Sequence, residues 1–143
     1  MTLAASLSEA AAVTKYVGLM LNADSIKRLH DWWVQATSQP LLPAKPPNAH
    51  VTLLYDPTPD QIAGFEIGER ISVRVIGWAS SDRIQAVVVS GVDVPAGRVA
   101  HVTLATAPGV KAQHASELIK AGYTRVSGPT LNGTVNVMRA RPR

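Results

Sequence analysis

The chain has no cysteine among its 143 residues, which excludes disulfide bonds, zinc sites built on thiolates and a cysteine nucleophile. Aromatic residues are scarce, and they do not alternate with Lys or Arg in the pattern that stacks single-stranded bases. The sequence contains no run of about 18 apolar residues that could span a membrane. These absences argue against extended nucleic-acid binding and against a membrane partner.

The chain is rich enough in hydrophobic residues, at 46%, to form a single domain over residues 1–143. Residues 1–13 lack the basic residues of a secretory signal, and with the missing cysteines this indicates a cytoplasmic protein, in the host cytoplasm if it is viral. We expect a flexible leader at 1–14 and a basic tail at 139–143. The net charge of +4 mildly favours anionic ligands.

Apolar periodicity and turn residues predict an α+β fold with mainly antiparallel sheet and two main helices. One helix follows the capping residues 22–25, and the other spans about 111–121 and ends on Gly122. Prolines between 40 and 47 form an extended connector, and 56–60 is expected to be a turn. Strands are expected at Tyr16–Leu21, Ala49–Tyr55, Ile71–Trp78, Ile84–Val89, Val99–Thr106 and Gly133–Met138, with a short one near Tyr123–Val126.

The pentapeptide Ala-His-Val-Thr-Leu occurs twice, at 49–53 and 100–104, each time in an expected strand. Successive side chains of a strand point to opposite faces, so His50 and Thr52 share one face, as do His101 and Thr103. A single His on a strand is more often a satisfied structural residue than a catalytic one. A matched pair of imidazoles and hydroxyls instead favours catalysis, and we expect the two strands to face each other across a groove around a phosphate.

The two H-x-T-x tetrapeptides, beginning at His50 and His101, resemble the signature of the 2H phosphoesterase superfamily, which includes LigT-like RNA phosphodiesterases. The likeness covers most of the chain from Tyr16 onward. Residues 16–18 and 97–111, each followed by a helix, are similar to the catalytic domain of 2′,3′-cyclic-nucleotide 3′-phosphodiesterases and to the cyclic phosphodiesterase domain of fungal and plant tRNA ligases. The small size is similar to phage phosphodiesterases that destroy cyclic oligonucleotide signals of bacterial immunity.

The resemblance implies a bilobal fold with rough two-fold symmetry, in which each lobe gives one strand to a central groove. It implies that His50 and His101 are the general acid and base and that Thr52 and Thr103 bind the phosphate, without metal or cofactor. The chemistry agrees, because one imidazole can take a proton from water while the other, charged, protonates a leaving ribose oxygen. For a 2′,3′-cyclic phosphate the resemblance implies opening to a 2′-phosphate, with the roles of the two histidines left open.

Three further residues are candidates for substrate binding. The rings of Tyr16 and Trp78 could stack on a base, although burial in the core explains them equally well. Arg98 could hold a phosphate, but it lies three positions before His101, and in a regular strand this odd spacing would point its side chain away from the His face. His30 and His114 fall on expected helices outside any H-x-T-x pattern and are left out of the site.

Other functions remain open at this stage. The same four residues would serve a phage-type hydrolase of cyclic oligonucleotides or 2′-5′ oligoadenylate, or a non-catalytic module that binds a nucleotide or RNA end. A metal hydrolase could use His50, His101 and Asp56, but no H-x-x-x-H pattern or carboxylate cluster supports it. The sequence thus predicts a nucleotide, cyclic nucleotide or RNA terminus as substrate, and leaves the choice among them and the oligomeric state open.

Overall fold

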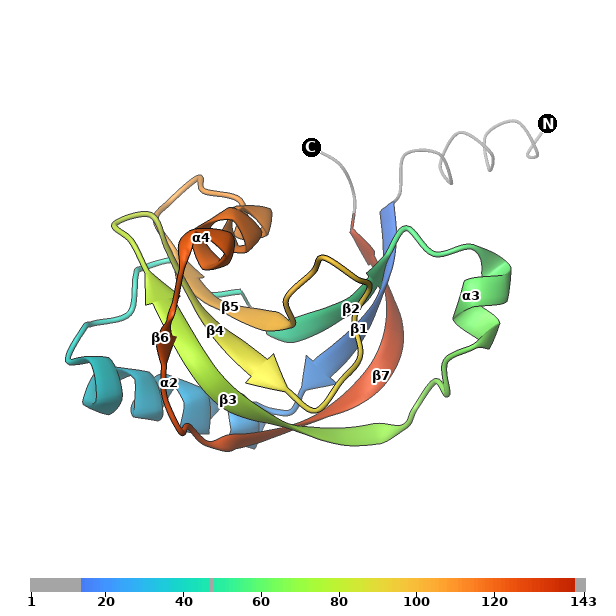
Figure 1. Ribbon diagram of the computed structural model, residues 1–143, viewed down its shortest axis with the longest axis horizontal. Coiled ribbons are helices and arrows are strands. Elements are labelled where there is room, and N and C mark those ends of the chain that lie inside the picture. Colours follow the sequence, from blue (N-terminus) through green and yellow to red (C-terminus); the bar gives the residue numbers. More distant parts are fainter. Residues whose placement is uncertain (1–13, 47, 141–143) are drawn as a thin grey trace.

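The computed structural model describes residues 14–46 and 48–140 of the chain (Figure 1). The leader expected at 1–14 lies outside this range apart from Thr14, and so do residues 141–143 of the expected tail. The elements in chain order are β1 (Thr14–Leu21), α2 (Ala23–Thr37), β2 (His50–Tyr55), α3 (Pro59–Ala63), β3 (Arg70–Ser80), β4 (Ile84–Ser90), β5 (His101–Thr106), the 3-10 helix η1 (Ala112–His114), α4 (Ala115–Ala121), β6 (Thr124–Arg125) and β7 (Thr130–Ala140). This content confirms the α+β class.

Six of the strands close into an antiparallel barrel, in the order β4-β5-β2-β1-β7-β3, with β3 pairing back to β4. Alternation of side chains explains the interior, because Val17, Leu19 and Leu21 of β1 are all buried in it. Residues 84–89 of β4 are all buried because both faces of the strand are covered: Val87 points into the barrel, whereas Val88 belongs to a second cluster that includes residues of α4. The prediction of mainly antiparallel sheet is confirmed.

The barrel consists of two interleaved copies of one unit, β1-β2-α3-β3 and β4-β5-α4-β7, with α2 and β6 as additions. β2 pairs with β5 through Val51 and Val102, the middle residues of the two pentapeptides. At the other junction between the units, β3 pairs with β7, with Ser72 opposite Asn132. β1 and β4 even share a register shift at the same place. An approximate two-fold axis therefore passes between Val51 and Val102.

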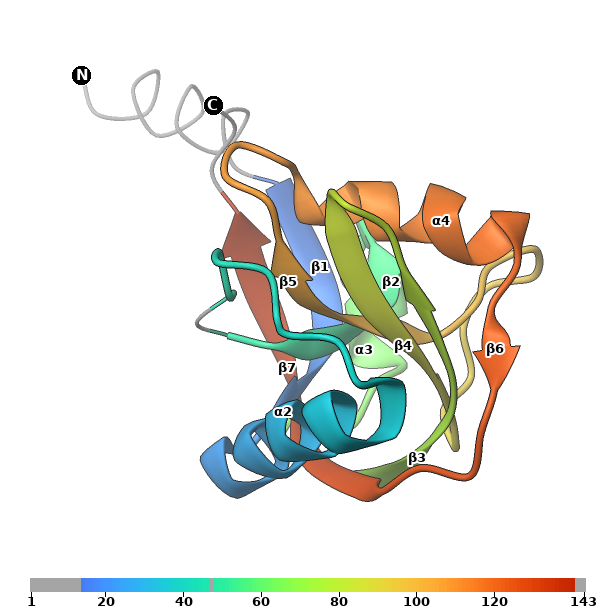
Figure 2. The ribbon, with the colours of Figure 1, turned by 90° about the vertical axis from the view of Figure 1, so that its left-hand side faces the viewer.

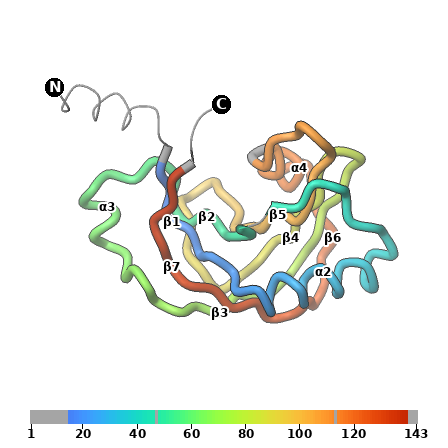
Figure 3. Tube along the Cα trace, turned by 180° about the vertical axis from the view of Figure 1, so that it is seen from behind, coloured from blue at the N-terminus to red at the C-terminus, as the bar shows by residue number. Residues whose placement is uncertain are grey.

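The two units share one closed sheet, because the first strand of each pairs with the last strand of the other, β1 with β7 and β4 with β3. Figure 3 shows the chain trace of both units curving around this common barrel. The strands that carry the two H-x-T-x tetrapeptides are consequently neighbours in the sheet. The expectation that they face each other across a groove from separate lobes is corrected by this pairing.

α2 packs against the barrel through Leu29 and Trp33. Its N-cap is Asn22, whose side chain accepts a hydrogen bond from the Ser25 N–H. In Figure 2, α2 and α4 lie on opposite sides of the barrel strands. None of the helices in the described ranges is long and apolar enough to cross a membrane.

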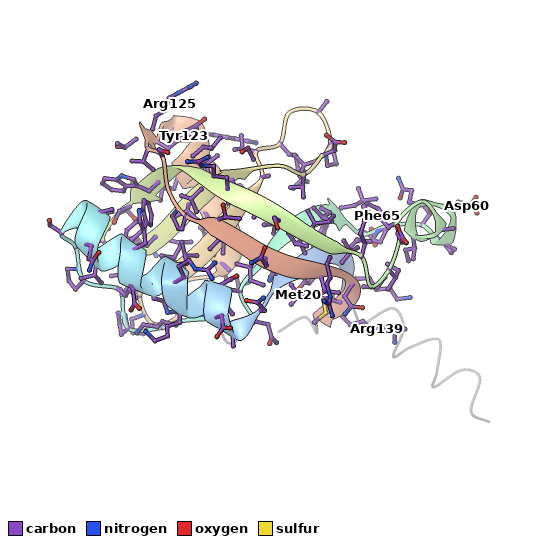
Figure 4. The ribbon with its side chains drawn as sticks, turned by 90° about the horizontal axis from the view of Figure 1, so that it is seen from below. Met20, Asp60, Phe65, Tyr123, Arg125 and Arg139 are labelled. Carbon is purple, nitrogen blue, oxygen red and sulfur yellow. The ribbon has the colours of Figure 1, made fainter. Side chains whose placement is uncertain are left out.

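Residues 56–60 were expected to form a turn, and this prediction is wrong for the second half of that segment. Thr58 and Gln61 form a capping box that starts the short helix α3, with Pro59 at its first position. α3 buries none of its residues, whereas α4 buries Ala115 and Ile119. Figure 4 shows Asp60 and Phe65, in and just after α3, at the opposite end of the molecule from Tyr123 and Arg125, which follow α4.

The last strand extends further than expected at both ends. Within β7, Arg139 pairs with Lys15 of β1, so the expected basic tail begins later than residue 139.

Candidate functional site

The outer face of the paired strands β2 and β5 carries the two histidines and the two threonines of the H-x-T-x tetrapeptides. Between them, Val51 and Val102 point into the barrel and are fully buried. Antiparallel pairing of these two valines puts His50 opposite Thr103 and His101 opposite Thr52. The four side chains thus form a square, with the histidines on one diagonal and the threonines on the other. Diagonal neighbours of this kind are about 7–8 Å apart, which leaves room for a phosphate between two imidazoles.

Each imidazole is held in the same way by the backbone of its own strand. His50 Nδ1 lies 2.8 Å from the carbonyl oxygen of Asn48, and His101 Nδ1 lies 2.9 Å from that of Val99. A carbonyl oxygen can only accept, so Nδ1 carries a hydrogen in both rings. Nε2 is therefore the atom of each histidine that can take a proton when the ring is neutral, or give one when it is charged.

Tyr16 belongs to this site and covers His50. The two rings are stacked with their centroids 4.7 Å apart and their planes at 25°. Gly18 makes room for the tyrosine, because a Cβ at that position would lie 3.0 Å from Tyr16 Cε2. The tyrosine hydroxyl stays protonated at neutral pH, since burial raises the pKa of Tyr16 above its usual 10.0.

Burial lowers the pKa of His50 below its usual 6.5. The hydrogen bond with the Asn48 carbonyl opposes this effect, and the positive charge that His101 can carry adds to it. His50 is therefore neutral at pH 7, with Nε2 free to accept a proton.

A cavity of about 480 Å³ adjoins this square on the side of Thr52 and His101. Its walls are β2 from Thr52 to Tyr55, the loop 94–99, His101, and the residues Ser116, Ile119 and Lys120 of α4. On the other side of the two-fold axis Tyr16 stacks on His50, and the Thr103 hydroxyl donates to the Ala112 carbonyl at 3.3 Å. From Thr52 and His101 the cavity extends toward α4.

Arg98 is also in the wall of this cavity. In a regular strand its side chain would point away from the His face, but β5 begins only at His101. Arg98 instead closes a turn, in which its N–H donates to the Pro95 carbonyl at 3.1 Å and Gly97 has a φ of 83°. A glycine at the third position with positive φ is typical of a type II turn. Strand alternation therefore does not fix the direction of the Arg98 side chain.

Reasoning from the sequence missed three cavity residues with a polar group or an aromatic ring: Tyr55, Ser116 and Lys120. Strict alternation would turn Tyr55 inward with Val51 and Leu53. The register shift opposite Val17 and Gly18 reverses this, so that Tyr55 is 55% exposed. Ser116 and Lys120 could have been found, because they flank the buried Ile119 and lie one helical turn apart.

Trp78, the remaining candidate, lies outside the site, and so do the two histidines that were left out of it. The Trp78 ring packs edge-on against Trp33 of α2, with centroids 5.5 Å apart, and it is not part of the cavity wall. The structure thus places Trp78 with the core, not with the site. His114 is exposed, with Nδ1 3.8 Å from a Glu117 oxygen, and His30 is half-buried on α2. Neither lines the cavity.

A metal site based on His50, His101 and Asp56 finds no support in the geometry. Across residues 14–46 and 48–140, no three His, Asp or Glu side chains come together in a group that could hold a metal ion.

In comparisons with known proteins, no family model matches the chain, and neither does any curated protein.

Proposed function

We propose that the protein is a metal-independent phosphodiesterase that hydrolyses nucleotide or RNA phosphodiester bonds with two histidines, opening 2′,3′-cyclic phosphates to 2′-phosphates. The observation that carries this proposal is the two-fold related pair His50 and His101. Both have Nδ1 hydrogen-bonded to a carbonyl, and they lie diagonally across two paired strands. The internal two-fold symmetry also accords with the resemblance to the 2H phosphoesterase superfamily.

The two sides of the site support different roles for the histidines. His50 is the general base, because burial under Tyr16 favours its neutral form. Its Nε2 takes a proton from water as the water oxygen attacks phosphorus. His101 is the general acid, because it borders the cavity in which the ribose would lie. As the bond from phosphorus to the 3′-oxygen breaks, the charged His101 gives its Nε2 proton to that oxygen.

The threonines support the same reaction. The Thr52 and Thr103 hydroxyls, on the other diagonal, can donate to the non-bridging oxygens as negative charge shifts onto them. Thr103 must first release the carbonyl of Ala112, to which its hydroxyl donates over 3.3 Å. This bond is long for a hydroxyl donor, so the exchange costs little.

The test is hydrolysis, in the presence of EDTA, of 2′,3′-cyclic mononucleotides, an RNA with a 2′,3′-cyclic end, 2′-5′ oligoadenylate and cyclic dinucleotides. The His50→Ala/His101→Ala double variant should lose turnover, and His114→Ala, which removes an exposed imidazole outside the site, should keep it. Turnover of oligoadenylate or cyclic dinucleotides alone would assign the protein to destruction of immune signals. Binding without turnover by the wild type would contradict catalysis and make the protein a nucleotide-binding module.

A further inference from the structure

The cavity beside His101 has features that the acid–base scheme does not use. Two cationic residues line it from different elements, Arg98 from the loop 94–99 and Lys120 from α4. No acidic residue is present among the described residues of its wall. Tyr55 adds an aromatic ring, and Ser116 a hydroxyl one helical turn from Lys120. Such a combination suits a ligand with both a negative charge and a flat ring.

The size and position of the cavity show where such a ligand would extend. Its volume of about 480 Å³ exceeds the space that the scissile phosphate needs on the β2–β5 pair. The cavity lies beside α4, which packs on β3 and β4 and buries Ala115 and Ile119, whereas its counterpart α3 has no fully buried residue. A substrate held between His50 and His101 therefore has space to continue toward Arg98 and Lys120.

We propose that this cavity binds a second phosphate of the substrate, together with the base next to it, and this inference rests on the proposed function. The second phosphate lies between Arg98 and Lys120, and a base lies against Tyr55. An Arg guanidinium can donate two parallel hydrogen bonds to a phosphate, and a Lys ammonium adds a compact positive charge. The substrate class is then a nucleotide chain with at least one phosphodiester beyond the bond that is cleaved, not a cyclic mononucleotide.

Two substrates with the same reacting group separate this inference from the proposed function: adenosine 2′,3′-cyclic phosphate, and the dinucleotide ApA that ends in a 2′,3′-cyclic phosphate. We expect the wild type to have the higher kcat/KM for the dinucleotide. Arg98→Gln and Lys120→Gln should each lower kcat/KM for the dinucleotide about tenfold or more, mainly through KM, because each removes a charged hydrogen-bond donor. Neither should change kcat/KM for the mononucleotide more than about twofold.

The matched control is Arg83→Gln, which removes the same charge from the exposed turn between β3 and β4, outside the cavity wall. It should leave both substrates unchanged. A second measurement is the dependence of the dinucleotide KM on salt, which should become shallower in Arg98→Gln and Lys120→Gln because each variant loses one phosphate contact.

Equal losses on both substrates, or no loss on the dinucleotide, would overturn the second phosphate site while the two-histidine hydrolysis stands. Failure of the wild type to hydrolyse either substrate would instead overturn the proposed function, and this inference with it.

Discussion

The proposed roles of His50 and His101 can be separated by changing the leaving atom of the substrate. In a 2′,3′-cyclic analogue with sulfur in place of the 3′-oxygen, the leaving group is a thiolate. The pKa of a thiol is about 8.5, far below that of a ribose hydroxyl, so a thiolate departs without being protonated. A general acid is then dispensable, whereas the water still needs a general base. The pair of substrates therefore reports on each histidine by itself.

The expected magnitudes follow from the position of each ring. General acid or base help is worth about 100 to 10,000-fold in rate. His101 borders the cavity that would hold the ribose, so His101→Ala should lose this factor on the oxygen substrate and recover most of it on the sulfur analogue. His50 lies under Tyr16 on the closed side, so His50→Ala should lose a factor of about 100 to 10,000 on both substrates.

Release of the thiol can be followed with a chromogenic disulfide reagent, and this protein causes no background because it has no cysteine. Single-turnover rates of the wild type and both variants on both substrates complete the experiment. Recovery by His50→Ala instead of His101→Ala would show that the roles are reversed. A loss of only a few-fold in either variant on the oxygen substrate would refute two-histidine catalysis.

Three further predictions concern the surroundings of the two histidines. Because burial lowers the pKa of His50, kcat/KM should fall with acid only below pH 6.5. Tyr16→Ala exposes the His50 ring and should move the midpoint of this fall to higher pH, whereas Tyr16→Phe should not. Equal midpoints in the pH–rate profiles of the wild type and Tyr16→Ala would contradict the effect of the stack. Thr52→Val and Thr103→Val should each lower kcat about 100-fold, whereas Thr→Ser at either position should keep kcat close to that of the wild type. An unchanged kcat in the Val variants would show that the hydroxyls do not stabilise the transition state. Gly133→Ala should lower the free energy of unfolding by about 1–3 kcal/mol in urea titrations, because its Cβ would lie 2.7 Å from the Met20 carbonyl oxygen. Asn136→Ala on the exposed face of β7 is the control, and equal stability of the two variants would contradict the close contact of β1 with β7.

The local parts of this structure could be predicted from the sequence, because each depends on few neighbouring residues. Alternation alone put His50 and Thr52 on one face and Val51 on the other, and the structure confirms it. Asn22 and Gly122 marked helix ends for the same reason, since capping is decided within one turn. The long-range parts could not be predicted, because which strands pair depends on how the two units interleave.

Tyr55 shows how one such long-range feature changed the candidate site. A single strand gives no sign of a bulge, since the shift in register arises between β1 and β2, at Val17 and Gly18. Once the shift is present, Leu53 and Leu54 both contact the core and Tyr55 turns outward into the cavity. The sequence therefore pointed to the H-x-T-x residues on β2 and β5, but not to Tyr55 in the cavity wall.

The difference between the outer faces of β1 and β4 also originates in the sequence, but it becomes visible only once the strand register is known. Tyr16, Gly18 and Met20 of β1 hold positions equivalent to Ile84, Ala86 and Val88 of β4, since their partners on β2 and β5 correspond. On β4 these positions are small or branched and form an apolar surface that Ala115 and Ile119 of α4 cover. On β1 the tyrosine covers His50 instead, and α3 packs against the barrel core through the partly buried Ile62. The two units thus differ in one outer face: Tyr16 stacks on one histidine, His50, whereas the other, His101, borders the cavity.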